Sequence, residues 1–343
     1  MQTIWLAIDP IDTLFFRGAE SMVAGENHEV DSLFPPMPAT IIGAIRTAIL
    51  GQNGIAPVDY LKNPESWRDR FPCLGLPEAP GFELSGPLFV AGDDCLLLPA
   101  PSHWFADTPE EKKKWEEKIL VQAGRPLTGS PLGLTGSTVA PVWLHTPIKA
   151  AMKPLAGWWA TAEAFTLVRQ GQKVRFTREQ GDLHSGEAAI LPASALFVRE
   201  ERVGIALTAE RIAKEGHLYS TVHVRLRERV RILAGVVSEY PFPLSSEGIL
   251  QLGGEQRICR YKVLSGLKLP EEKSGSIGMT LSPLAVSDLP NNLSKVPRAS
   301  GKLLRIGGWD MARGFHKPMT AWLPAGTVFF ADNNELPMQL LMI

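Results

Sequence analysis

The chain carries D-P-I-D-T-L-F-F-R-G at residues 9–18 and, after a loop-like segment, F-P-P-M-P-A-T-I-I-G-A-I-R-T-A-I-L at residues 34–50. Just before the first motif, T-I-W-L-A-I at residues 3–8 is a short apolar run with the length of a buried strand. Asp9 and Pro10 end this run, because proline cannot donate to a strand ladder and aspartate favours turns. The first motif therefore marks the place where a strand ends and the chain turns outward.

The second motif predicts a packed helix. Pro38 stands where a first helical residue tolerates proline, Gly43 would let the helix lie close to a neighbour, and Arg46 would leave on the other face. The apolar positions recur at helical spacing: Ile41, Ile42, Ile45, Ile49 and Leu50. A strand, a turn, a long loop and a packed helix in this order indicate the opening of a ferredoxin-like or RRM-like half.

Composition limits the classes of function. The chain has 343 residues, 45% of them apolar, with 35 Lys and Arg against 36 Asp and Glu. A protein that coats polyanions generally would be basic, so any nucleic-acid site here must be a local patch on a neutral body. The three cysteines are far apart, which argues against a disulfide framework and a cysteine-rich metal site and fits a reducing cytoplasm. The first residues do not form a signal peptide and no apolar run has membrane-spanning length, so we expect a cytoplasmic protein without membrane contact.

The distribution of strands and breakers predicts an α+β fold with two ferredoxin-like or RRM-like domains and long Gly/Pro-rich loops. We place the N-terminal domain at residues 1–195, with helical and loop insertions at about 100–160, and a β-rich C-terminal domain at residues 196–343. A capping box at Thr108 and Glu111 predicts an exposed helix over residues 110–122. Residues 124–157 are rich in glycine and proline and predict a long arm.

The segment T-V-H-V-R-L-R-E-R-V-R at residues 221–231 is the most informative candidate site. We expect one long strand with a bend or bulge over residues 218–237, and strand side chains alternate between faces. One face would then carry His223 and four arginines about 6.6 Å apart: Arg225, Arg227, Arg229 and Arg231. Two interpretations are open: the arginines grip the phosphates of RNA, or they form a solvated face and pair with acids on neighbouring strands.

Two glycine-rich segments also suggest phosphate contact, because glycine lets backbone N–H groups approach an anion closely. The stronger is G-G-W-D-M-A-R-G-F-H-K-P-M at residues 307–319, where aromatic rings could stack on bases. Its candidate residues are Gly308, Trp309, Arg313, His316 and Lys317. The weaker segment, at residues 253–257, contributes Gly253, Gly254 and Arg257. An ordinary β-turn with a buried tryptophan is the alternative for the first, and an ordinary hairpin for the second.

Signals for catalysis are poor. The seven histidines show no zinc-hydrolase spacing, and the sequence lacks a nucleophile elbow, a P-loop and a strand-linked dinucleotide motif. Asp9 and Asp12 are better explained as turn caps than as paired catalytic acids. We predict no catalytic residue, no metal and no cofactor. If the chain did cleave RNA without a metal, His28 or His223 would be the base.

The chain also resembles a known family. The two opening motifs, E-E-R-V-G-I-A-L at 200–207, E-G-H-L-Y-S at 215–220, L-G-G-E-x-R at 252–257 and G-W-D-M…K-P…L-P-A-G-T-V-F-F between 308 and 330 occur in the family's order. They resemble the RAMP-superfamily subunit of type III-B CRISPR (Cmr) effector complexes that holds the 5′ handle of the guide RNA (crRNA). Together, rather than singly, these motifs make the resemblance specific.

The resemblance implies a non-catalytic RNA-binding subunit that clamps the crRNA 5′ handle, abuts the large polymerase-like subunit and starts the filament of backbone RAMP subunits. Motif by motif, it places these positions near RNA: Arg17, Arg46, Gly253, Gly254, Arg257, Gly308, Lys317 and Gly326. The arm at 124–157 would be the projection that kinks a guide–target duplex. Two alternatives stay open: a metal-independent endoribonuclease that processes repeat RNA, as related RAMP proteins do, and a pure protein–protein adaptor.

Overall fold

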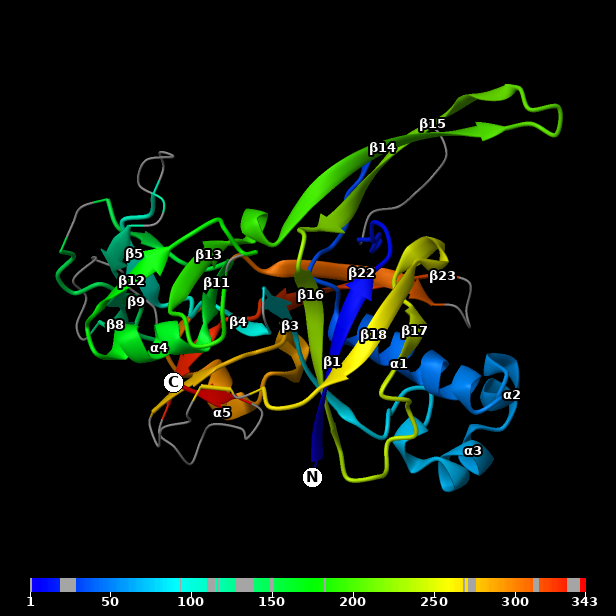
Figure 1. Cartoon of the computed structure of the whole chain (residues 1–343), viewed down its shortest axis with the longest axis horizontal. Coiled ribbons are helices and arrows are strands. Elements are labelled where there is room, and N and C mark those ends of the chain that lie inside the picture. Colours follow the sequence, from blue (N-terminus) through cyan, green and yellow to red (C-terminus); the bar gives the residue numbers. More distant parts are fainter. Residues whose placement is uncertain are drawn as a thin grey trace.

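The computed structural model describes residues 2–18, 29–92, 94–109, 115, 117–127, 139–148, 151–181, 183–267, 269–270, 276–310, 315–331 and 340–343. For residues 2, 29, 206, 213–219, 308–310 and 315–317 it describes the backbone alone. The chain has a mixed α+β structure in which strands predominate over helices (Figure 1). Within the described ranges, no helix combines the length and the apolar composition that crossing a bilayer requires.

The largest sheet joins strands that lie far apart between residues 2 and 264. Its spatial order is β17 (Glu247–Gln251), β18 (Ile258–Leu264), β1 (Gln2–Pro10), β16 (Val230–Ser238), β3 (Glu83–Ala91), β4 (Cys95–Pro99), β11 (Trp158–Thr161), β13 (Ala189–Pro192), β12 (Lys173–Phe176) and β6 (Lys118–Leu120). Strand β1 pairs antiparallel with β16 on one side and with β18 on the other. Strands from both sides of residue 195 thus share one sheet, and the two-domain division at that residue stays a prediction.

The opening strand and helix are as the sequence predicts. The apolar run ends at Pro10, the last residue of β1, and helix α1 (Pro38–Gln52) begins with Pro38 in its first turn. The helix contributes Ile41 and Ile45 to a buried cluster with Leu6 and Ile8 of β1, while Trp5 belongs to a second cluster. Both faces of β1 are therefore covered, which explains its unbroken apolar sequence.

The surroundings of Gly43 differ from those predicted for this helix. We expected it to allow a close approach, but a Cβ at this position would meet nothing within 4 Å. Gly43 lies exposed, so the packing of α1 depends on its isoleucines instead. The other helices are short: α2 (Pro57–Lys62), α3 (Pro64–Arg70), α4 (Ala162–Arg169), α5 (Asn291–Ser294) and the 3-10 turns η1 (Pro72–Leu74), η3 (Ala193–Ala195), η4 (Gly254–Gln256) and η5 (Val286–Asp288).

Smaller sheets surround the main one. Three of them have the orders β10 (Lys153–Pro154), β5 (Trp104–Ala106), β7 (Gln122–Ala123); β21 (Arg298–Ala299), β24 (Val328–Phe330), β19 (Ile277–Met279), β25 (Leu341–Met342); and β20 (Leu284–Ala285), β23 (Phe315–Leu323), β22 (Leu304–Asp310). A two-stranded ladder joins β8 (Arg125–Pro126) and β9 (Val142–Trp143). The predicted helix over residues 110–122 is wrong at its end, since β6 and β7 occupy 118–123, and residues 110–114 lie outside the described ranges.

The remaining sheet forms a long hairpin that projects from the body (Figure 1). It pairs β14 (Phe197–Leu207) with β15 (Ala213–Leu226), and the two-residue strand β2 (Glu29–Val30) adds to β15. We expected a projecting hairpin at residues 124–157. The described part of that arm contains the short strands β8, β9 and β10, of which β8 and β9 pair antiparallel, so the expected projection at that position stays a prediction.

Candidate functional site

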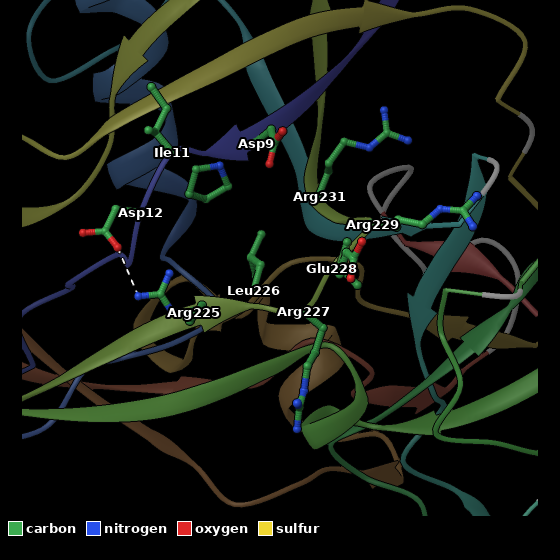
Figure 2. A pocket seen from close by; sticks show the side chains of 11 residues that line it. Asp9, Ile11, Asp12, Arg225, Leu226, Arg227, Glu228, Arg229 and Arg231 are labelled. Carbon is green, nitrogen blue, oxygen red and sulfur yellow. Dashed lines mark hydrogen bonds and ion pairs between the residues drawn. The ribbon is translucent and has the colours of Figure 1, made fainter.

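A hollow of about 380 Å³ opens at the end of β1. It is lined by residues 9–12, which end the strand and begin the following turn, and by residues 225–231, which connect β15 to β16 (Figure 2). Four arginines and three acids lie in these two segments: Arg225, Arg227, Arg229, Arg231, Asp9, Asp12 and Glu228. The hollow therefore brings together the first sequence motif and the arginine-rich segment.

The arginine-rich segment is two strands and a turn, and not the single strand that we predicted. Strand β15 ends at Leu226 and β16 begins at Val230, whose N–H donates to the carbonyl of Arg227 at 3.1 Å. The backbone of Arg229 adopts a φ of 59°, and its carbonyl accepts the N–H of Gly92 at 3.1 Å. The turn rotates successive side chains, so strict alternation between two faces is lost.

The four arginines consequently point in different directions around the hollow (Figure 2). Arg227 donates from Nε to the Ser194 carbonyl at 3.3 Å, and Arg229 donates from Nη1 to the Gly181 carbonyl at 2.6 Å. Arg231 forms an ion pair with Asp94 at 2.6 Å. The evenly spaced ladder on one face was therefore wrong, although all four residues do line one hollow.

Arg225 is held by acids from two other segments. Its Nε lies 2.7 Å from Glu200 on the neighbouring strand β14, and its Nη2 lies 3.1 Å from Asp12. Arg202 adds contacts of 2.9 Å to Glu200 and 3.6 Å to Asp12. Hydrogen bonds from Arg225 and Arg202 lower the pKa of Glu200 to about 2. For Arg225, pairing with acids on neighbouring elements is thus the interpretation that the structure supports.

Asp12 also ties the glycine loop, residues 253–257, to the end of β1. Arg257 Nη1 lies 3.2 Å from Asp12, and Arg257 Nη2 contacts Glu255. The pKa of Asp12 lies below its ordinary value, chiefly because its carboxylate accepts a hydrogen bond from the Thr13 backbone and faces Arg202 and Arg225. The positive charges of three arginines here equal the negative charges of three acids: Arg202, Arg225, Arg257, Asp12, Glu200 and Glu255. These ion pairs hold the base of the long hairpin against the end of β1.

His223 lies inside this network rather than on an open face. It is 1% exposed, its Nδ1 lies 3.1 Å from Thr13 Oγ1, and its ring stacks on Phe15 with centroids 5.2 Å apart. Burial lowers the pKa of His223. We expected it beside the arginines on an open face, but both faces of β15 are covered at this point, since His223 and its neighbour Val224 are each 1% exposed. The nearest acid, Glu255, is 4.0 Å from Nε2.

Gly253 and Gly254 pack against the first motif. Gly253 has a φ of +83°, and a Cβ there would lie 2.5 Å from the Phe15 carbonyl oxygen. Gly254 donates its N–H to that same oxygen at 2.8 Å. Two motifs more than two hundred residues apart are therefore joined through backbone contacts that exclude a side chain.

The predicted residues of the 307–319 segment lie on the β22–β23 hairpin. Gly308 pairs with Lys317, and Trp309 pairs with His316. Arg313 lies outside the described residues. Gly326 lies beyond the hairpin, with a φ of +83° and a Cβ position 2.7 Å from the Ala100 carbonyl, so it packs against the loop that follows β4.

Arg17 and Arg46 fall in different surroundings. Arg17 is exposed, and its backbone bridges to Ser32. Arg46 is half-buried and donates to the Leu76 carbonyl at 2.8 Å, to the Pro77 carbonyl at 3.1 Å and to the Tyr60 hydroxyl. Neither residue lines the hollow.

Sequence reasoning missed three residues of the charge network: Glu200, Arg202 and Glu255. It also assigned Asp12 to a turn cap alone. The E-E-R and G-G-E-x-R motifs contain these residues, but no spacing rule connects them, since the contacts depend on tertiary packing. In the part of the chain that the structure describes, no three His, Cys, Asp or Glu side chains gather as metal ligands would.

Comparisons with known proteins identify the family of the chain. The family model described as CRISPR-associated protein (Cas_Cmr3) matches residues 6–342. The chain belongs to this family. The match spans both halves and every motif on which the resemblance rested, so the resemblance to a Cmr RAMP-type subunit is confirmed.

Solved structures share the fold. A chain of the type III-B Cmr-beta complex bound to cognate target RNA and AMPPnP has a TM-score of 0.50 at 17% identity, with 95% of this chain and 86% of that chain covered. A second structure, of Cmr-beta bound to cognate target RNA, gives 0.50 at 16% identity with the same coverage. A chain of the Csm3-Csm4 subcomplex of the type III-A interference complex gives 0.45 at 12% identity, with 99% and 94% covered. A comparison with curated proteins found no match.

Proposed function

We propose that this protein is a non-catalytic RNA-binding subunit of a type III-B CRISPR effector complex, and that it holds the 5′ handle of the crRNA. The family membership supports a component of a type III complex. The similar Cmr-beta chains come from complexes described as bound to cognate target RNA. The single observation that carries the handle assignment is the arginine-lined hollow, which lies where the first motif meets the arginine-rich turn.

The charge balance within the hollow suggests which residues meet RNA. Arg225 and Arg257 each pair with two acids, so we assign them to positioning, whereas Arg231 pairs with one described acid, Asp94. Arg227 is exposed and its only described side-chain contact is the one from Nε to a carbonyl, while a guanidinium carries five donors. We propose that Arg227, with Arg229 and Arg231 beside it, contacts phosphates. Arg257 and the glycine pair would hold the first motif, which lines one side of the hollow, in place.

The β22–β23 hairpin supplies a second element of the proposed surface. Gly308, Trp309, Arg313, His316 and Lys317 stay assigned to it, as the sequence predicts. Arg17 also belongs to the proposed surface, since it is exposed and lies in the first motif. Arg46 does not, because its guanidinium holds the loop at residues 76–77.

The strand order supports one ferredoxin-like unit. Strands β18, β1, β16 and β3 are neighbours in that order, and α1 connects β1 to β3. This is the arrangement of a ferredoxin-like sheet, in which the first strand is central and a helix follows it. We propose that the large polymerase-like subunit and the backbone RAMP subunits pack on surfaces of this body, as the resemblance implies.

The long hairpin is the better candidate for the projection that kinks a guide–target duplex. Val203, Ile205 and Leu207 alternate along β14, and Val203 is 72% exposed. Apolar side chains that wedge between base steps unstack and kink a duplex. We propose that β14–β15, rather than residues 124–157, has this role.

Binding of the repeat-derived 5′ handle RNA tests the proposal. Arg227→Ala with Arg231→Ala should weaken binding, and the slope of log affinity against log salt should become less negative by about 0.7 for each phosphate of the single strand that is no longer neutralised. Arg169→Ala, at the exposed end of α4, is the matched control and should bind as the wild type does. Unchanged affinity in the double variant would remove the handle assignment.

The enzyme alternative requires a different experiment. A general base must reach the substrate proton that it abstracts, whereas His223 is 1% exposed, and His28 lies outside the described residues. Incubation of the pure protein with repeat RNA should leave the RNA intact. A discrete metal-independent cut, abolished by His28→Ala or His223→Ala, would favour the endoribonuclease.

A further inference from the structure

A second basic feature lies between α5 and β22. Four cations occur within eleven positions, with no acid between Asp288 and Asp310: Lys295, Arg298, Lys302 and Arg305. None of them lines the hollow, and neither the glycine-rich segments nor the arginine-rich turn includes them. In a chain with a net charge of −1, an acid-free basic segment requires an explanation.

These four side chains lie exposed, and no ion pair joins any of them to a described acid. Arg202, Arg225 and Arg257, by contrast, each contact one or more carboxylates. Arg298 makes a single described side-chain contact, from Nη1 to the Ser294 carbonyl at 3.4 Å. The positive charge of this segment is thus presented to solvent, while that of the network at the hollow is cancelled.

The backbone beneath the four cations is well anchored. Arg298 and Ala299 pair with Phe329 and Val328 of β24, two residues that are fully buried. Ser300 Oγ lies 3.2 Å from Thr327 Oγ1, and a Cβ at Gly301 would already be 3.3 Å from Pro324. The segment is therefore a preformed surface, so binding would not have to order it first.

The composition of the segment favours a phosphate backbone as its ligand. Lys295 directly follows α5, Arg298 lies in β21, Lys302 lies in a bend and Arg305 lies in β22, so one continuous exposed segment carries all four cations. The hydroxyls of Ser294 and Ser300, exposed among them, donate to the carbonyls of Asn291 and Gly301, so the cations are the donors that a ligand would meet. Separate cations contact phosphates without reading bases. The segment also leads directly into β22, which carries Gly308 and Trp309 of the proposed RNA surface.

We propose that Lys295, Arg298, Lys302 and Arg305 form a second, sequence-independent binding strip for the phosphate backbone of single-stranded RNA. The strip is separate from the hollow and would hold RNA beyond the handle. This inference rests on the proposed function, because it assumes that RNA is already held elsewhere on the protein.

Binding of a labelled oligouridylate to the full-length chain tests the strip. The strip variant replaces all four residues by glutamine: Lys295→Gln, Arg298→Gln, Lys302→Gln and Arg305→Gln. The control variant removes the same charge from exposed positions on other elements: Lys62→Gln, Arg68→Gln, Arg169→Gln and Lys173→Gln. We expect the strip variant to lose at least tenfold in affinity and its salt slope to become less negative by about 2.8, from ~0.7 per phosphate contact. The control should change little.

Other outcomes separate the two proposals. If the strip variant binds oligouridylate as the wild type does, while Arg227→Ala with Arg231→Ala still loses handle RNA, the strip is refuted and the proposed function stands. An equal loss in the control variant also refutes it, because general charge would then explain binding. If the wild type binds neither RNA, both proposals fail. Should the strip variant not fold, the pairs Lys295→Gln/Arg298→Gln and Lys302→Gln/Arg305→Gln are each expected to lose part of the affinity.

Discussion

Replacement of Gly253 by alanine probes the junction between the two distant motifs. At a φ of +83° an L-residue costs roughly 1–2 kcal/mol. The added Cβ would also lie 2.5 Å from the Phe15 carbonyl oxygen, a clash with backbone that cannot rotate away. Overpacking of this kind costs about 1–3 kcal/mol. We therefore expect Gly253→Ala to lower the free energy of unfolding by about 2–5 kcal/mol in total.

Gly266→Ala is the matched control, because Gly266 has a φ of +80° but a Cβ there would meet nothing within 4 Å. The difference between the two variants isolates the clash, at about 1–3 kcal/mol. At about 2 °C per kcal/mol, typical of large domains, Gly253→Ala should melt ~2–6 °C below Gly266→Ala in a thermal scan followed by tryptophan fluorescence. Equal melting temperatures would show that the glycine loop does not press on Phe15, and would refute the junction.

Three further predictions concern other parts of the chain. Glu200 has a pKa of about 2 in the folded protein against an ordinary 4.5, so its contribution to stability is present above pH 4.5 and is lost as the pH falls toward 2. Glu200→Gln should therefore flatten the pH dependence of the melting temperature between pH 4.5 and 2. An unchanged profile would contradict the pairing with Arg225. Arg46→Met should lower the melting temperature, since the carbonyls of Leu76 and Pro77 and the Tyr60 hydroxyl lose their donor. It should leave the affinity for handle RNA unchanged. Weaker RNA binding at an unchanged melting temperature would show that Arg46 contacts RNA. The three buried thiols have pKa values raised by burial, to about 11 for Cys73 and about 12 for Cys95 and Cys259, so a thiol reagent should modify them only after denaturation; fast labelling of the native protein would contradict their burial.

Local patterns were sufficient to predict several elements. Strand β1 and helix α1 follow from a short apolar run, a proline at each boundary and isoleucines at helical spacing. The hairpin of β3 and β4 turns at residue types that favour turns, with Gly92 and Asp94 both at positive φ. In these cases the chemistry of neighbouring residues determines the backbone, so the sequence alone contains the necessary information.

Tertiary contacts explain where prediction failed. The segment at 218–237 alternates like one strand, but Arg229 adopts a left-handed conformation that divides it into β15 and β16. His223 alternates with valines like an exposed residue, yet Leu14 and Phe15 cover it from the first motif. The capping box at Thr108 predicted a helix whose C-terminal part pairs as β6 with β12 instead. A strand partner far along the chain overrides each of these local signals.

The same reasoning applies to the candidate site. The sequence identified the arginines, the glycine pair and the first motif separately, because each is a local composition. It could not show that Asp12 joins Arg225 and Arg257, since these three residues meet only through the packing of β1, β15 and the loop before β18. Which arginines are neutralised, and which are available to a ligand, depends on those contacts.

Crosslinking of guide RNA in the reconstituted effector complex tests the central claim most directly. With a photoreactive uridine in the 5′ handle and peptide-level identification, we expect crosslinks on this chain within residues 225–231 or 252–257, at the hollow beyond β1. Crosslinks confined to α2 and α3 (residues 57–70), or handle crosslinks found on other subunits alone, would contradict the assignment of the handle to this hollow.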